Sequence, residues 1–159
     1  MIYALIAAAL VILDQVVKYL VMTNIAFGEH VPFIPYILEL TYVENTGAAF
    51  SIFSDHTWAL ALVSLAMSLV LALALWKNFF RHPFGKLALT LLLAGAFGNF
   101  IDRAFRGYVV DMFNVLFMHF AVFNVADICV VVGGIAAGAY YLLLWDKLEG
   151  RHDSADAEG

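Results

Sequence analysis

The stretch FNVADICVVVGGIAAGAYYLLLW, residues 123–145, contains a single charged side chain, Asp127, close to its start. A helix of about 20 mainly apolar residues crosses the hydrocarbon core of a membrane. A carboxylate in such surroundings is expensive to desolvate, so it needs either a partner or a function. The stretch therefore predicts a transmembrane helix that begins with a chemically unusual group. Within it, Gly134 and Gly138 form a Gly-x-x-x-Gly pattern, which permits close packing against another helix, and Gly133, Ala136 and Ala137 lie beside it.

The whole chain shares this apolar character. Of its 159 residues, 64% are hydrophobic and 13% are charged, and the mean hydropathy is +0.91, outside the usual composition of soluble domains. Three further apolar runs, at about residues 2–22, 57–76 and 84–101, are long enough or nearly long enough to cross a membrane. We therefore expect an all-α membrane protein with a bundle of four transmembrane helices. A single domain would cover residues 1–150, followed by a disordered polar tail at residues 151–159.

The loops between these runs differ in their basic residues, which tend to stay on the cytoplasmic side. The loop at residues 23–56 has no Lys or Arg, whereas the short loop after the second run and the C-terminal tail contain Lys77, Arg81, Lys86, Lys147 and Arg151. This distribution predicts that both termini are cytoplasmic. Arg103 and Arg106, after the third run, oppose the assignment.

The first outer loop is too long to be a plain connection. Its segment 38–43 alternates apolar and polar residues, as a half-buried strand does, and a turn signal follows at residues 45–47. We expect a small extramembrane β-hairpin or sheet that covers the outer mouth of the bundle. In the second outer loop, residues 112–120 are apolar with few helix breakers, so a short amphipathic helix along the membrane interface is expected there.

Under this orientation, polar residues from distant parts of the chain collect at the outer membrane interface. A protein that only needed to sit in the bilayer would have no reason for this arrangement, because such groups are costly near lipid. The interface is therefore the candidate functional site. Its residues are Asp14, Lys18, Asn45, Asn99, Asp102, Arg103, Asp111, Asn124 and Asp127.

Asp111 and Asp127 stand out because both lie among apolar neighbours. If they face each other they can share one proton, since two like charges in close contact cannot both stay ionised. That is the chemistry of an aspartyl hydrolase. The alternative is that Asp127 caps its helix or bonds inside the bundle, while Asp111 is a solvated loop residue. Asn124, three residues before Asp127 on the same helical face, favours the functional interpretation.

The residues at the end of the third run share one helical face, because Asn99, Asp102 and Arg103 follow helical spacing. In a functional role, Asn99 and Arg103 would hold the backbone carbonyls of an extended peptide. In a structural role, Asp102 would form an ion pair at the helix end with Arg103 or Arg106.

Asp14 and Lys18 lie toward the outer end of the first run, one helical turn apart and with the acid first, which is the favourable order. Here a structural role is favoured over a chemical one.

Composition excludes several classes of function. The net charge is −5 and no basic patch exists to neutralise phosphates, which argues against nucleic acid as a partner. The single cysteine, Cys129, cannot form an internal disulfide, and its apolar surroundings favour a packed, inert thiol. The histidines do not form a zinc-peptidase motif, and there is no glycine-rich phosphate loop. No metal or organic cofactor is therefore expected.

Two other functions remain open from the residues alone. A small transporter or channel component would have Asp14, Asp102, Asp111 and Asp127 lining an ion path. It would spread carboxylates through the membrane depth, yet the midplane segments 60–73 and 87–94 contain none, which favours an enzyme. An assembly subunit, whose polar residues only join helices, would tolerate single Asp to Asn changes.

Five sequence blocks resemble, in order, the bacterial lipoprotein signal peptidases, also called type II signal peptidases. The similarity extends to about Leu144. The blocks are Leu13-Asp14-Gln15 with Lys18, residues 45–50 (NTGAAF), Gly98-Asn99 with Asp102-Arg103, Val109-Val110-Asp111, and residues 123–127 (FNVAD). Met112 and Ile128, beside the two aspartates, depart slightly from the family pattern and leave the chemistry unaffected.

This resemblance implies a membrane-embedded aspartyl endopeptidase that removes the signal peptide of prolipoproteins just before a diacylglyceryl-modified cysteine. Asp111 and Asp127 would be the catalytic pair, and Asn45, Asn99, Arg103 and Asn124 would position the substrate. The implied partners are a lipidated prolipoprotein and membrane lipids, without a cofactor. We expect a monomer in the bacterial cytoplasmic (inner) membrane, with its active site toward the outer face.

Overall fold

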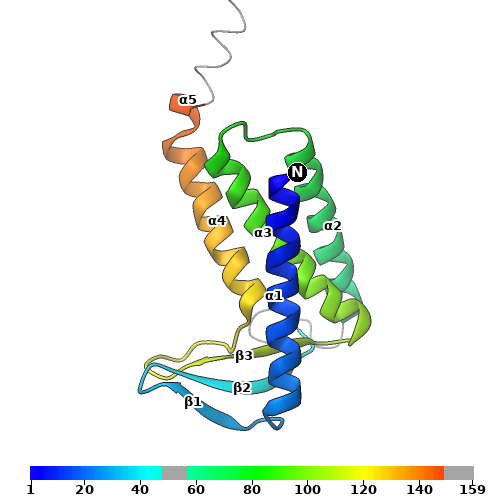
Figure 1. Ribbon diagram of the computed structural model, residues 1–159, viewed down its shortest axis with the longest axis vertical. Coiled ribbons are helices and arrows are strands. Elements are labelled where there is room, and N and C mark those ends of the chain that lie inside the picture. The colour runs from blue at the N-terminus through cyan, green and yellow to red at the C-terminus, as the bar shows by residue number, and fades with distance from the viewer. Residues whose placement is uncertain (48–56, 149–159) are drawn as a thin grey trace, which may run out of the picture.

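The computed structural model describes residues 1–47 and 57–148, so the tail expected to be disordered lies outside the described residues. Four long helices are each apolar enough to cross a membrane, which confirms the predicted bundle (Figure 1). The third helix is longer than its apolar run and includes the polar residues at 102 and 103. The helices are α1 (Ile2–Asn24), α2 (Thr57–Trp76), α3 (Pro83–Phe105) and α4 (Val125–Leu143), followed by a single turn, α5 (Trp145–Leu148).

Helix α3 packs against each of the other three long helices, and its approach to α4 is especially close. A Cβ atom added at Gly95 would lie 2.3 Å from the carbonyl oxygen of Ala126, and one added at Gly133 would lie 2.8 Å from the main-chain nitrogen of Leu92. Close packing was predicted for this group of small residues in α4, and Gly133 is the one that makes it. The sequence pattern alone could not show which of these residues α4 turns toward α3, and a Cβ at Gly138 would meet no described atom within 4 Å.

Three antiparallel strands form one sheet in the order β1-β2-β3: β1 (His30–Ile34), β2 (Leu38–Asn45) and β3 (Val109–Val115). The first two make the hairpin expected in the first outer loop. The third comes from the second outer loop, where the prediction of a helix at residues 112–120 was wrong. A short apolar run is compatible with either structure, and here the free edge of β2 satisfies the main-chain groups of residues 109–115.

The sheet lies at one end of the bundle, and the N-terminus, the α2–α3 connection and α5 lie at the other (Figure 1). Val110 and Met112 of β3 are fully buried in a cluster with Val21 and Ile25 at the end of α1. This apolar contact holds the sheet against the helices. It places the last residue of β2 and the middle of β3 beside the adjoining ends of α3 and α4.

Candidate active site

Asp111 lies in β3 and is only 2% exposed. Its Oδ2 accepts a hydrogen bond from Nδ2 of Asn45, in the paired strand, at 2.9 Å. Its Oδ1 accepts from Nδ2 of Asn124, the residue before α4, at 2.7 Å. The alternative of a solvated loop residue is therefore wrong, because the sheet buries this carboxylate and amide groups from two elements hold it.

Asp127 lies in the first turn of α4, where a negative charge interacts favourably with the helix N-terminus. It forms a reciprocal capping box with Asn124. The Asp127 Oδ2 accepts from the main-chain N–H of Asn124 at 3.2 Å, and the Asn124 Oδ1 accepts from the main-chain N–H of Asp127 at 2.9 Å. The other oxygen, Oδ1, accepts from Nδ2 of Asn99 at 2.8 Å. Asp127 thus caps its helix and is also held by a side chain of α3.

Both aspartates line one cavity of about 490 Å³. Its polar wall also includes Asn45, Asn99 and Arg103, and its other walls are apolar. One apolar wall is the segment 120–123, and the other is a line of side chains along α4: Ile128, Val130, Val131 and Val132. Two carboxylates from elements far apart in the chain therefore face a single, mostly apolar space.

The pKa of Asp111 is raised from its ordinary value of 3.8 to about 6, chiefly because the carboxyl group is buried. The negative charge of Asp127 contributes to this rise, whereas the hydrogen bonds from Asn45 and Asn124 and the charge of Lys18 oppose it. Since both carboxylates line one cavity, their charges can interact. Asp111 therefore keeps its proton to a higher pH than an ordinary aspartate does.

Arg103 binds differently from the ion pair considered for it. Its guanidinium donates to the carbonyl oxygen of Gly47 at 3.2 Å and to Oγ of Ser64 in α2 at 3.4 Å. Its Nε is buried and has no hydrogen-bond partner among residues 1–47 and 57–148, although the side chain lines the cavity. Of the two arginines predicted as partners of Asp102, Arg106, one turn later, forms the ion pair.

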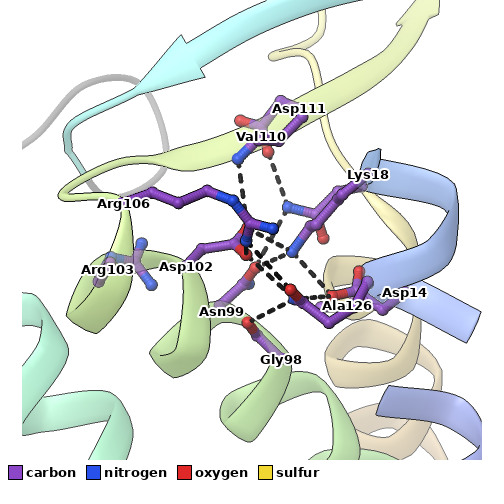
Figure 2. A network of polar contacts seen from close by, with 12 residues as sticks. Asp14, Lys18, Gly98, Asn99, Asp102, Arg103, Arg106, Val110, Asp111 and Ala126 are labelled. Carbon is purple, nitrogen blue, oxygen red and sulfur yellow. Dashed lines mark hydrogen bonds and ion pairs between the residues drawn. The ribbon is translucent and has the colours of Figure 1, made fainter. Parts of the chain in front are cut away.

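A buried ionic cluster lies near Asp111 (Figure 2). Lys18 is 0% exposed, and its Nζ is 2.8 Å from Oδ2 of Asp14 and 2.8 Å from Oδ2 of Asp102. The same Asp102 oxygen accepts from the main-chain N–H of Val110 at 3.3 Å. This cluster joins α1, α3 and β3.

The sequence analysis included Gln15 in a family block but gave it no role, and the structure shows that it connects this cluster. Its Nε2 donates to Oδ1 of Asp102 at 3.0 Å and to Oδ2 of Asp14 at 3.1 Å, and its Oε1 accepts from Arg106 at 3.0 Å. An amide beside an acid within an apolar run was the available signal. Ser64 was also overlooked, and a lone serine in an apolar helix gives no signal of its contact with Arg103.

The chemistry available at this site is that of carboxylates, amides and one guanidinium. Within the described part of the chain, no group of three or more His, Cys, Asp or Glu side chains could hold a metal ion. Two interacting carboxylates, one with a raised pKa, can act as a general acid and a general base on opposite sides of a bond.

Comparison with known proteins agrees with this geometry. Residues 6–143 match the sequence profile of the family described as Signal peptidase (SPase) II. The lipoprotein signal peptidase of Enterococcus faecalis is 45% identical over 142 residues, covering 89% of this chain and 88% of that protein. The lipoprotein signal peptidase of Brevibacillus brevis is 39% identical over 131 residues, covering 82% of this chain and 88% of that protein.

A solved structure is similar over nearly the whole chain. It is a bacterial membrane enzyme determined by the in meso method, with a TM-score of 0.82 and 34% identity, covering 92% of this chain and 90% of that one. The bundle and its sheet are therefore shared with an enzyme of bacterial membranes.

Proposed function

The chain belongs to the signal peptidase II family, and from this premise we propose that Asp111 and Asp127 are the catalytic pair of a protease that removes signal peptides from prolipoproteins. One observation carries the proposal: both carboxylates line the same cavity, and each is held by amide donors. The protein is a multi-pass bacterial membrane protein, so the reaction takes place at the membrane.

In the proposed mechanism, the ionised carboxylate takes a proton from water while the protonated one donates a proton to the scissile carbonyl. The water oxygen adds to the carbonyl carbon, and the tetrahedral intermediate collapses as a proton passes to the leaving amine. The raised pKa of Asp111 favours the singly protonated state of the pair that this cycle requires. Because the two groups interact, the shared proton belongs to the pair.

The surrounding residues have separate proposed tasks. Asn45, Asn99 and Asn124 hold the carboxylate oxygens in place. Arg103 lines the cavity, and its buried Nε has no hydrogen-bond partner among the described residues. This N–H is suited to donate a hydrogen bond to a carbonyl of the substrate. Asp14, Lys18 and Asp102 support the site by joining the elements that carry it.

The substrate we propose is a prolipoprotein whose cysteine carries a diacylglyceryl group. The relatives are named lipoprotein signal peptidases, and the apolar wall of the cavity along Ile128 and Val130 to Val132 suits acyl chains that remain in the bilayer. We further propose that the chain works as a monomer with membrane lipids around it.

The orientation is proposed from basic residues. The connection between α2 and α3 contains Lys77 and Arg81, the start of α3 contains Lys86, and α5 contains Lys147. These segments lie at the same end of the bundle as the N-terminus, and the sheet lies at the opposite end (Figure 1). Basic loops favour the cytoplasm. Both termini would then be cytoplasmic, in the inner membrane, and the catalytic pair would face outward.

The test is cleavage of a diacylglyceryl-modified precursor by Asp111→Asn and Asp127→Asn, with an unlipidated twin in parallel and products identified by mass. Each substitution preserves size but removes an ionisable group, so kcat should fall at least about 1,000-fold. Glu29→Gln, which changes an exposed carboxylate outside the cavity, serves as the matched control and should cleave normally. Normal cleavage by either aspartate variant would refute the assignment.

A further inference from the structure

Each amide that holds the catalytic pair has its own oxygen occupied by a group that can only donate. The Asn45 Oδ1 accepts from the main-chain N–H of Gly47 at 2.9 Å. The Asn124 Oδ1 accepts from the main-chain N–H of Asp127 at 2.9 Å. The Asn99 Oδ1 accepts from Nζ of Lys18 at 3.2 Å. Main-chain N–H and ammonium groups carry no acceptor, so the direction of all three amides is determined.

This direction matters because the NH₂ end of each amide then points at a carboxylate oxygen. For Asn99, a reversed amide would turn its NH₂ toward the ammonium of Lys18 and its carbonyl oxygen toward Oδ1 of Asp127. Donor would meet donor and acceptor would meet acceptor, with burial making each unpaired group more costly. Asn124 supports the same direction, since its Nδ2 donates to Oδ1 of Asn99 at 3.2 Å.

The three orienting groups differ in one respect. Two are main-chain N–H groups close in sequence to the amide they orient, whereas the third is the side chain of Lys18, on a different helix from Asn99. Lys18 does not line the cavity, and it is fully buried between Asp14 and Asp102 (Figure 2). Among the described residues that line the cavity, Asn99 is the one to which Lys18 donates a hydrogen bond, and the charge of Lys18 also lowers the pKa of Asp111.

We infer that Lys18 is a positioning residue for the cleavage reaction, because it sets the direction of the Asn99 amide and thereby keeps a hydrogen-bond donor on Asp127. This inference rests on the proposed catalytic pair. Without the ammonium, the Asn99 oxygen keeps the bond from Nδ2 of Asn124 but loses the stronger, charged donor, so the amide reverses more readily. In the reversed state the Asp127 carboxylate lacks the bond that holds Oδ1 in place. A misdirected catalytic group can lower the rate on the order of 100-fold.

The variants must separate this role from the charge balance of the cluster. Removing Lys18 alone would leave Asp14 and Asp102 without their shared cation, which is strongly destabilising. We therefore use Asp14→Asn as the reference, since an asparagine oxygen can still accept from the N–H of Ala126. Adding Lys18→Met to this reference leaves Asp102 paired with Arg106, so that no carboxylate of the cluster lacks a cation. Thermal unfolding in detergent verifies that each variant is folded.

The measurement is kcat and KM on a diacylglyceryl-modified precursor, in a double-mutant cycle with Asn99→Leu. In the reference background, Lys18→Met should lower kcat on the order of 100-fold and leave KM within about twofold. Because Lys18 acts through Asn99, adding Lys18→Met to Asn99→Leu should cause no further loss. The inference would be overturned if the losses in kcat from Lys18→Met and Asn99→Leu multiply in the combined variant. It would also be overturned if Lys18→Met leaves kcat unchanged.

A second substitution at Lys18 separates the orientation of the Asn99 amide from the effect of the positive charge. It also provides a test if the Lys18→Met variant does not fold. Lys18→Gln restores a donor for Asn99 without the positive charge, so kcat should return to within about tenfold of the reference. A loss as large as that expected for Lys18→Met would overturn the inference.

Asp127→Asn in the same background tests the proposed function itself. If this variant still cleaves the precursor, the proposed catalytic pair is wrong. If it is inactive but the double-mutant cycle does not give the expected result, only the role of Lys18 is refuted.

Discussion

The Asp14 carboxylate in α1 accepts a hydrogen bond from the main-chain N–H of Ala126, 112 residues later, at 2.9 Å. Ala126 lies in the first turn of α4, where the main-chain N–H groups have no partner within the helix. One carboxylate thus pairs with Lys18 through one oxygen and caps a different helix through the other. This contact aligns the start of α4, which carries Asn124 and Asp127, with the first helix.

Asp14→Ala should be much more destabilising than Asp14→Asn. Alanine leaves the N–H of Ala126 unpaired and removes one partner of buried Lys18, at a cost of about 3 kcal/mol in the free energy of unfolding. Asparagine keeps an acceptor for that N–H, so it should cost about 1 kcal/mol. Denaturation in detergent measures both. Equal losses would show that the cap does not contribute.

Gly95→Ala should disturb both stability and catalysis. The added Cβ would lie 2.3 Å from the carbonyl oxygen of Ala126, so α3 and α4 must separate. We expect a loss of about 2 kcal/mol in stability and a lower kcat, because Asn99 and Asp127 lie on the two separated helices. The matched control is Gly138→Ala, which meets no described atom within 4 Å and should be neutral or stabilising by up to about 1 kcal/mol. Equal effects of the two would contradict this packing.

Asp111→Asn should change how stability depends on pH. The pKa of Asp111 is raised from 3.8 to about 6, so between these values the folded protein binds more protons than the unfolded chain. Stability therefore falls as pH rises through this window and stays lower above it, by about 3 kcal/mol. Asparagine cannot ionise and should lack that decrease.

The measurement is the difference in melting temperature between the wild-type protein and Asp111→Asn at several pH values. Relative to wild type, the variant should gain stability as the pH rises from about 4 to about 7. A difference that does not vary with pH would show that Asp111 ionises normally in the folded protein.

Asn45→Ala should shift the pH dependence of cleavage. If Asp111 and Asp127 form the proposed catalytic pair, the pair should lose its shared proton as the pH rises through about 6, the pKa of Asp111, so kcat/KM should decline above that pH. The hydrogen bond from Asn45 lowers this pKa, and its removal should move the declining limb to higher pH. A shift to lower pH, or none, would contradict the contribution of Asn45.

Hydropathy located the four transmembrane helices because a chain in lipid must satisfy its main-chain groups within each segment. That constraint is local, so a run of apolar residues is sufficient evidence. The alternation at residues 38–43 predicted β2 for a similar reason. Strand β3 could not be predicted with the same certainty, because its pairing depends on an edge that a distant loop provides.

The sequence by itself determined the membrane spans, the end of the bundle at which the polar residues gather, and, through its similarity to a family, the two aspartates proposed for catalysis. Only the tertiary structure decided that Arg106 rather than Arg103 pairs with Asp102, that Gly133 rather than Gly138 packs against α3, and that Lys18 donates a hydrogen bond to the side chain of Asn99. The reason is that hydropathy depends on neighbours along the chain. A hydrogen bond or a close contact depends instead on the rotation and depth of two separate elements, to within a fraction of an ångström.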